Sequence, residues 1–360
     1  MRTPSSSTLP DFPWNSLEPA KAQASQHPEG LINLSVGSPV DDVAPGIQLA
    51  LAEAGAAGGY PQTIGTPALR QAIVDSLARR YGISPAPAVL PVVGTKEAIA
   101  LLPSLLGVRG TVIIPEVAYP TYEVAALLAG ATPLRASTPP AEAEDVDLIF
   151  INSPSNPTGA VASHEQLRDW VEYARKHNAI LASDECYLGL SWEGQAASIL
   201  DPEVSDGDYS NLLAIHSLSK TSNLASYRSG FFAGDAELIA ELTEVRKHAG
   251  LMMPGPIQAA TVAALEDDDQ EQAQKLRYAN RRAVLMRALV DAGFRIEHSE
   301  AGLYLWITRD EDCWDTVQWF AKRGILVAPG AFYGPAGERF VRVALTASLE
   351  QCEQVAQRLS

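Results

Sequence analysis

The sequence has few cysteines and a shortage of positive charge, and both limit the classes of protein to which it can belong. Its three cysteines, Cys186, Cys313 and Cys352, lie far apart and form no C-x-x-C pair, which argues against a disulfide framework and a zinc site. Lysine and arginine together number 27, against 43 aspartates and glutamates, so the formal net charge is -16. This charge repels nucleic-acid backbones and anionic membrane surfaces. We therefore expect no nucleic-acid partner, no membrane partner and no metal.

Long apolar stretches are also absent. No run approaches 18 consecutive apolar residues, and the opening segment MRTPSSSTLPDFPW has no apolar stretch after its single arginine. The sequence thus predicts a soluble, untargeted protein of the cytoplasm. The first 16 residues or so are rich in proline and serine, and we expect them to form an arm or to be disordered.

Short apolar runs of strand length alternate with segments of helical periodicity over the first two thirds of the chain. The chain has 360 residues, of which 46% are hydrophobic, enough for one large domain and a smaller one. A helix is expected over residues 163–178. The apolar runs are mostly continuous, which is typical of strands covered on both faces: 89–94, 111–115, 147–152, 179–184, 211–217 and 229–234. This alternation predicts βαβ units and a parallel sheet.

The pattern changes after about residue 235, where long helical segments lead into a mixed tail. The expected fold class is α/β, with a large sheet domain and a smaller α+β domain. We expect an arm and part of the small domain over 1–45, the large domain over 46–245 and the rest of the small domain over 246–360. The acidic run EDDDQE at 266–271 lacks the glycine of a calcium loop, so it is interpreted as a solvated helix connection.

Polar residues follow four of the apolar runs at the point where each run ends. Ligands of open parallel sheets bind beyond the carboxyl ends of the strands, so these residues are expected to lie together. Taken singly, each has a structural alternative, because Asn156 and Gly159 suit a turn while Thr95 and Asp184 suit a helix cap. A coherent set at four strand ends favours a binding site: Thr95 and Lys96, Asn156, Asp184 and Tyr187, and Ser217 and Lys220.

The chemistry of this set points to one cofactor. Gly94 and Thr95 at a helix N-terminus, together with Ser217 and Arg228, are suited to a phosphate group. A lysine with a pKa near 10.4 is neutral in only about one molecule in 2,500 at pH 7, but a nearby arginine lowers that pKa and condensation with an aldehyde removes the charge. A carboxylate can hold a ring nitrogen protonated. Phosphate, aldehyde and pyridinium together are pyridoxal 5'-phosphate.

Five motifs carry a resemblance to a known family. The sequence resembles the class I/II aminotransferases of the type I pyridoxal-phosphate fold over nearly its whole length, from LSVGSP at 34–39 to VRVALTAS at 341–348. That resemblance implies a seven-stranded type of sheet between helices in the large domain. The motifs are GYPQTIGTPALR at 59–70, NSPSNPTG at 152–159, SDECYLGL at 183–190, SLSK at 217–220 with an arginine eight positions after the lysine, and the late VRVAL at 341–345.

The resemblance also implies a role for each cofactor-binding residue. Lys220 would form the Schiff base with pyridoxal 5'-phosphate and later move the substrate Cα proton as a general base. Asp184 would pair with the pyridine nitrogen, and Asn156 and Tyr187 would hydrogen-bond the phenolic oxygen of the ring. Tyr119 would stack on the ring. The phosphate would be surrounded by Gly94, Thr95, Lys96, Ser217 and Arg228.

Substrate binding and assembly follow from the same resemblance. Arg342 would hold the substrate α-carboxylate, assisted by Asn156 and the backbone of Gly37. Tyr60 would reach the phosphate in the neighbouring subunit, which implies a homodimer with shared active sites that takes a small amino donor and a 2-oxo acid. One departure is Ser226, which stands where many relatives have glycine and raises a question about the backbone near Arg228.

Within the family, the sequence is most similar to actinobacterial N-succinyldiaminopimelate aminotransferases of lysine biosynthesis. This similarity implies transfer between N-succinyl-LL-2,6-diaminoheptanedioate and 2-oxoglutarate, with Lys96 or the cluster 246–248 as candidate partners for the extra carboxylates. Alternatives are an aminotransferase for aspartate, alanine or aromatic donors, and a pyridoxal-phosphate-dependent decarboxylase or C–S β-lyase. A DNA-binding regulator would need a basic domain, and a non-catalytic scaffold would have lost Lys220 or Asp184.

Overall fold

Hydrophobic runs in the first two thirds of the chain form one large sheet. The structure is a computed structural model that describes residues 5–360. Within them, a seven-stranded sheet has the order β2-β8-β7-β6-β5-β3-β4, and only β8 runs antiparallel to its neighbours. The prediction of a mostly parallel α/β sheet is therefore confirmed. The strands are β2 (Ala88–Val93), β3 (Thr111–Ile114), β4 (Thr132–Arg135), β5 (Val146–Asn152), β6 (Ile180–Asp184), β7 (Leu212–Ser217) and β8 (Ser229–Gly234).

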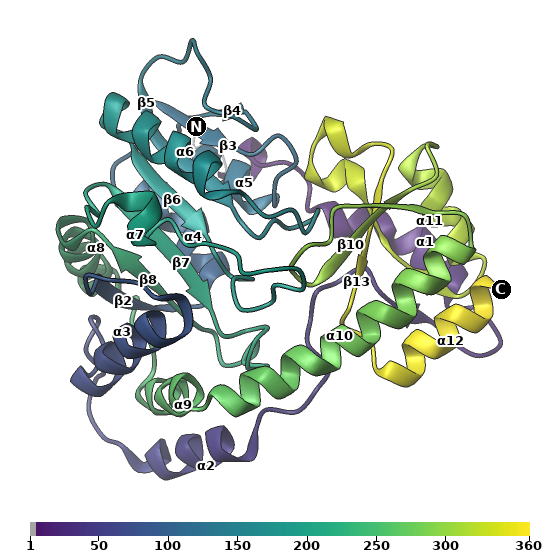
Figure 1. Ribbon diagram of the computed structural model, residues 1–360, viewed down its shortest axis with the longest axis horizontal. Coiled ribbons are helices and arrows are strands. Elements are labelled where there is room, and N and C mark those ends of the chain that lie inside the picture. The colour runs from purple at the N-terminus through teal and green to yellow at the C-terminus, as the bar shows by residue number, and fades with distance from the viewer. Residues whose placement is uncertain (1–4) are drawn as a thin grey trace.

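Helices cover both faces of this sheet (Figure 1), which explains why its strands are hydrophobic without alternation. Neighbouring residues serve opposite faces: Phe231 belongs to one core and Phe232 to the other. One face carries α2 (Pro45–Glu53), α3 (Pro67–Tyr81), α6 (His164–His177), α7 (Pro202–Ser205) and α9 (Gly255–Glu266). The other carries α4 (Thr95–Leu105), α5 (Thr121–Ala129) and α8 (Ala236–Ala249).

The ends of α6 illustrate how the sequence sets an element. Ser163 accepts a hydrogen bond from the backbone of Gln166, whose side chain bonds back to Ser163, so the helix begins with a capping box. It ends at Asn178, which adopts the left-handed conformation with φ 52°. The predicted helix over 163–178 is thereby confirmed.

A smaller α+β unit packs beside the sheet (Figure 1). Its antiparallel sheet has the order β12-β13-β10-β9, and β1 pairs in parallel with β11. Leu17, Ile32 and Leu34 from the start of the chain lie in the same core as the C-terminal strands. The elements are α1 (Glu18–Ala24), β1 (Ile32–Asn33), β9 (Arg295–Glu297), β10 (Tyr304–Thr308), α11 (Cys313–Ala321), β11 (Ile325–Leu326), β12 (Ala328–Pro329), β13 (Val341–Ala344) and α12 (Leu349–Leu359).

The described part of the N-terminal arm is folded against this unit. Residues Pro13–Leu17 form a short 3-10 helix, η2. Trp14 donates from its indole nitrogen to Ser35 O at 3.4 Å and packs on Phe332 with ring centroids 5.2 Å apart. Of the predicted arm, residues 1–4 lie outside the described residues, residues 6–12 are almost all exposed, and Trp14 packs against the small unit. The other 3-10 helices are η1 (Ser5–Thr8), η3 (Ala54–Ala56), η4 (Gly330–Tyr333) and η5 (Pro335–Gly337).

One long helix, α10 (Asp268–Asp291), runs from the large unit to the small one (Figure 1). Residues of α9 pack in the core beneath the large sheet, whereas Leu285 and Leu289 of α10 pack in the core of the small unit. The domain limits near residues 45 and 245 stay a proposal. The packing of α9 and α10 favours a boundary between the two units within α10. Among residues 5–360, no helix has the length and apolarity needed to cross a membrane.

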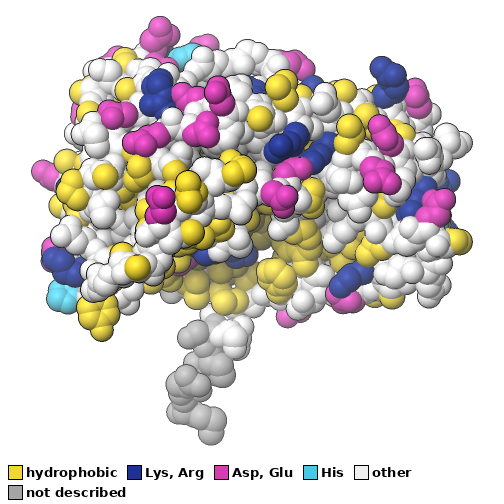
Figure 2. All heavy atoms as spheres, turned by 90° about the horizontal axis from the view of Figure 1, so that it is seen from below, with side chains coloured by type: hydrophobic (Ala, Val, Ile, Leu, Met, Phe, Trp, Pro, Cys, Tyr) yellow, Lys and Arg dark blue, Asp and Glu magenta, His cyan; other side chains and the backbone are white. Residues whose placement is uncertain are grey.

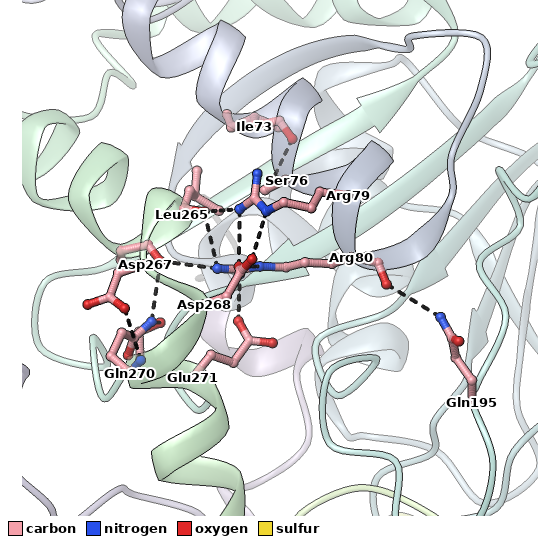
Figure 3. Close-up of polar contacts among 12 residues, drawn as sticks. Ile73, Ser76, Arg79, Arg80, Gln195, Leu265, Asp267, Asp268, Gln270 and Glu271 are labelled. Atoms are coloured by element: carbon pink, nitrogen blue, oxygen red, sulfur yellow. Dashed lines mark hydrogen bonds and ion pairs between the residues drawn. The ribbon is translucent and has the colours of Figure 1, made fainter.

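The acidic run at 266–271 joins α9 to α10 and, apart from Glu271, is at least partly exposed, as predicted. Two of its carboxylates also belong to an ion-pair network that was not predicted. Figure 3 shows Arg79 and Arg80 of α3 reaching across to Asp268 and Glu271 in the first turn of α10. The Arg80 Nη1 to Glu271 Oε2 distance is 2.5 Å, and both arginines also donate to the carbonyl of Leu265 at the end of α9. Hydrogen bonds from Arg79 and Arg80 hold the pKa of Asp268 at about 2. The sequence separation of almost 190 residues hid this contact.

Candidate active site

A cleft of about 930 Å³ lies where the carboxyl ends of β6 and β7 face the small unit. Residues of the arm, both units and the loop before α2 line it. Acidic and basic side chains are interspersed over the face drawn in Figure 2, and hydrophobic ones gather in a central recess. The cleft brings together most of the residues that the sequence predicts for the site: Gly37, Thr95, Lys96, Tyr119, Asn156, Asp184, Tyr187, Ser217, Lys220, Arg228 and Arg342.

Lys220 follows β7, and its partly buried side chain lines the cleft. Its Nζ donates a hydrogen bond to the carbonyl of Gly37, and the Tyr278 hydroxyl donates to the Lys220 carbonyl at 3.1 Å. Burial lowers the pKa of Lys220, and the charges of Arg342 and Arg228 add to that effect. The amine is thus held at a fixed place and is more easily deprotonated than a free lysine. A Cβ at position 37 would lie 2.0 Å from the Tyr304 hydroxyl, so only glycine allows the backbone to pass this close to Tyr304.

Asp184 ends β6 and is 5% exposed. Its Oδ2 accepts a hydrogen bond from the Tyr122 hydroxyl at 2.7 Å, and its Oδ1 accepts from the Cys186 backbone N–H at 3.2 Å. Burial raises the pKa of Asp184, and the hydrogen bonds from Cys186 and Tyr122 oppose that rise. A buried carboxylate held by neutral donors is best stabilised by a cationic group opposite it. The arrangement therefore fits a protonated ring nitrogen.

The N-terminus of α4 and Arg228 form an anion-binding corner. Gly94 precedes the helix with φ +75°, and a Cβ there would lie 2.2 Å from Arg228 Nη2. Only glycine lets the guanidinium approach the free N–H groups of the first turn. Arg228 itself has φ +58°, whereas Ser226 does not adopt a positive φ, so serine at that position causes no backbone strain. Ser217 also lines the cleft.

Arg342 in β13 is 2% exposed and has an incomplete set of partners. Its Nη1 donates to Asn156 Oδ1 at 2.9 Å and its Nη2 to Ser35 O at 2.7 Å. Its Nε has no hydrogen-bond partner among the described residues. The guanidinium carbon lies 4.0 Å from the centre of the Tyr304 ring. A buried arginine that lines a cleft and is not paired with a protein carboxylate fits a carboxylate ligand.

Tyrosines complete the walls of the cleft. The hydroxyls of Tyr187 and Tyr304 lie 3.1 Å apart, and Tyr119 meets Tyr122 edge-on with ring centroids 5.7 Å apart. Burial raises the pKa of Tyr119 to about 12 and that of Tyr187 further. Both of these phenols are therefore protonated at neutral pH and available as hydrogen-bond donors.

Two groups of predicted residues lie elsewhere. Tyr60 is 98% exposed and does not line the cleft of its own chain. The cluster 246–248 is wrong as a partner for substrate carboxylates, because Arg246 is fully buried against Glu97 at 3.2 Å and Lys247 pairs with Glu244 at 2.7 Å. Gly94 does not line the cleft. It contacts the Arg228 guanidinium at the anion-binding corner.

Sequence reasoning missed four residues of the site. Tyr122 lies in the first turn of α5, whereas Tyr119 precedes that helix, so helical spacing could not have revealed its contact with Asp184. Tyr304 faces the cleft because β10 pairs with β13, which the sequence does not reveal. Phe12 and Trp14 line the cleft from the arm, whose composition gave no hint of a role.

Comparison with known proteins decides the family. The model of aminotransferases class I and II matches residues 29–359. The chain belongs to the class I and II aminotransferases. This aminotransferase is 56% identical, over 99% of its length and 86% of the relative, to a Mycobacterium tuberculosis protein named a probable aminotransferase. It is 52% identical, over 98% of its length and 99% of the relative, to the Streptomyces rimosus 4-dedimethylamino-4-oxo-anhydrotetracycline transaminase OxyQ.

A solved structure agrees with the fold. The probable N-succinyldiaminopimelate aminotransferase of Thermus thermophilus superposes with a TM-score of 0.84 at 28% identity, over 97% of this aminotransferase and 99% of that chain. The fold is that of the type I pyridoxal-phosphate-dependent transferases. The family depends on pyridoxal 5'-phosphate, and the anion corner, the partly buried amine and the buried carboxylate fit its three polar groups.

Proposed function

We propose that this aminotransferase moves an amino group between N-succinyl-LL-2,6-diaminoheptanedioate and 2-oxoglutarate, as in lysine biosynthesis in the cytoplasm. The observation that carries the proposal is Lys96, an exposed cation that lines the cleft and makes no hydrogen bond or ion pair with any described residue. Its Nζ lies 5.5 Å from the centre of the Phe12 ring and 5.9 Å from that of Tyr119. A donor with additional carboxylates would give this cation an anionic partner in a charge-assisted hydrogen bond.

Five residues of the cleft would act on the cofactor. Pyridoxal phosphate supplies an electrophilic aldehyde and a ring that takes up the electron pair left at the substrate Cα. Lys220 binds it covalently, and Asp184 holds the ring nitrogen protonated. Asn156 and Tyr187 donate hydrogen bonds to the phenolic oxygen, while Tyr119 covers the ring face.

The substrate and the phosphate are held by separate cations. Arg342 binds the α-carboxylate, and the Gly37 backbone lies on the same side of the cleft as Lys220. Gly94, Thr95, Ser217 and Arg228 bind the phosphate. With the cofactor bound, the Lys220 amine would accept the substrate Cα proton as a general base. Its lowered pKa favours this proton transfer near neutral pH.

We also propose a homodimer with shared sites. Tyr60 is almost fully exposed in a single chain and lies outside its cleft, and this position suits a contact with the phosphate in a second subunit. A second candidate function is supported by the Streptomyces rimosus relative, which is 52% identical and is named as a transaminase of a tetracycline-type ketone. The amino acceptor or donor would then be a polycyclic compound.

Lys96→Met tests the assignment of the distal carboxylate. We expect KM for the succinylated donor to rise by about 10- to 100-fold, because a charge-assisted hydrogen bond contributes about 1.5–3 kcal/mol. KM for alanine should stay within about twofold. Lys247→Met is the matched control, because Lys247 pairs with Glu244 and does not line the cleft. An equal loss with all donors would instead assign Lys96 to the cofactor phosphate.

A panel of donors with 2-oxoglutarate as acceptor tests the function itself. The succinylated donor should give a kcat/KM at least about tenfold above those of glutamate, alanine, aspartate and aromatic amino acids, since it alone has two carboxylates besides the one that Arg342 holds. Preference for a simple amino acid would reject the proposed donor and leave the family assignment intact. Incubation with donor alone should stop after one half-reaction, whereas a β-lyase or decarboxylase would continue to turn over.

A further inference from the structure

A second polar cluster lies behind the wall of the cleft, on the side of β6 and β7 that faces α3. His216 in β7 stacks on Phe231 and on Tyr81, with ring centroids 5.1 Å and 6.0 Å away. Glu185, the residue after Asp184, is buried next to it. Neither side chain reaches the cleft, so neither has a place in the reaction as described above.

Three buried polar atoms in this cluster lack hydrogen bonds. Glu185 Oε1 accepts from the Ile199 N–H at 2.8 Å, but Glu185 Oε2 and His216 Nε2, 3.3 Å apart, have no hydrogen bond among the described residues. Thr221 Oγ1 is buried without a partner as well. Burying unpaired polar atoms costs free energy, so such groups are normally satisfied by protein or by bound water.

A small cavity of about 20 Å³ adjoins all three residues. A single water needs at least about 10–15 Å³ and two to four polar partners. Glu185 Oε2 accepts a hydrogen bond, Thr221 Oγ1 donates or accepts one, and His216 Nε2 donates when protonated. The size and the donor set of this cavity therefore match one water molecule.

The cluster is connected to the cofactor site through the backbone. Glu185 follows Asp184, His216 precedes Ser217, and Thr221 follows Lys220. The Glu185 N–H also donates to Ile215 O at 2.9 Å, which joins the ends of β6 and β7. On its outer side the cavity is lined by Arg80 and Glu271, which belong to the ion-pair network drawn in Figure 3.

We propose that this cavity is a binding site for one structural water, and that the hydrated His216 and Glu185 pair positions Asp184 and Lys220 for cofactor binding. The proposal rests on the roles given above to Asp184 and Lys220. His216 and Glu185 are positioning residues, because they act through their neighbours in the chain. When the imidazole carries both protons, the pair is an ion pair, and removal of either member leaves the other buried without compensation.

The test is an equilibrium titration of the full-length chain with pyridoxal phosphate, followed by its absorbance. We expect His216→Gln to raise Kd by about tenfold, because the buried Glu185 carboxylate then loses its partner. Glu185→Gln keeps the shape and the bond to Ile199, so it remains informative if the first variant does not fold. The double variant Glu185→Gln/His216→Gln should regain most of the affinity, since it contains no unpaired charge.

Ser76→Ala is the matched control. Ser76 lines the same cavity, but its hydroxyl already donates to Ile73 O at 2.8 Å (Figure 3), so Kd should not change. Variants that lower the melting temperature but keep the wild-type Kd would overturn the positioning role. A crystal structure that resolves buried waters and leaves the cavity empty would overturn the water site. If wild type itself fails to bind the cofactor at Lys220, the proposed function fails instead.

Discussion

Lys220→Ala is expected to abolish the covalent attachment of the cofactor and nearly all turnover. Borohydride reduction of the wild-type protein with pyridoxal phosphate, followed by mass spectrometry, should place the added mass on Lys220 alone. The variant should still bind the cofactor through its phosphate corner, but kcat should fall by at least about a hundredfold, because general base catalysis typically contributes about 10²–10⁴-fold.

Lys96→Ala is the control for this experiment, because it removes the other lysine of the cleft. It should keep the covalent link and the reducible absorbance. Labelling of Lys96 in place of Lys220, or normal turnover without Lys220, would contradict the assignment. A variant that neither folds nor binds is recognised by its loss of helical circular dichroism.

Asp184→Ala should cost about 3–4 kcal/mol of transition-state stabilisation, a fall in kcat of about 10²–10³, since it removes the charge that holds the ring nitrogen protonated. The cavity left by the side chain is small, so the fold should persist. Stopped-flow measurement of the half-reaction with donor alone separates this chemical step from product release.

Tyr122→Phe separates the charge of Asp184 from its position. It removes one hydrogen bond of 2.7 Å from the carboxylate and leaves the charge in place, so kcat should fall by about tenfold or less. Loss of activity in Tyr122→Phe as large as in Asp184→Ala would mean that orientation dominates. Turnover of Asp184→Ala near that of wild type would exclude the proposed pairing.

The strands of the large sheet were predictable from the sequence, because they are buried on both faces and each hydrophobic run is followed by polar residues. The run 229–234 corresponds to β8 (Ser229–Gly234), and the run 147–152 to β5 (Val146–Asn152). The edge strand β4 (Thr132–Arg135) escaped, because it is partly exposed and contains a proline. Such a strand lacks the continuous hydrophobic signal.

The candidate site was predictable where residues follow strands and unpredictable where it depends on long-range contacts. Asp184 and Lys220 stand at strand ends, so the βαβ pattern placed them together. Tyr304 and the free Nε of Arg342 depend on the pairing of β10 with β13, and the pairing of Arg80 with Glu271 joins segments almost 200 residues apart. Charge runs alone could not show that Arg246 is buried and Lys96 is not paired.

The long helix α10 constrains how substrates can enter. At about 1.5 Å per residue its 24 residues span about 36 Å. The helix is attached to the backbone of Lys220 by the Tyr278 hydroxyl, and to Asp41 in the loop before α2 by Gln274 and Arg281. A rigid-body rotation of the small unit would therefore pull on the backbone of Lys220. We expect Arg342 and Lys220 to keep a constant separation while substrates come and go. Substrates of different length should then be accommodated by displacement of Phe12 and Trp14, and the opening rate should depend on the arm rather than on a hinge.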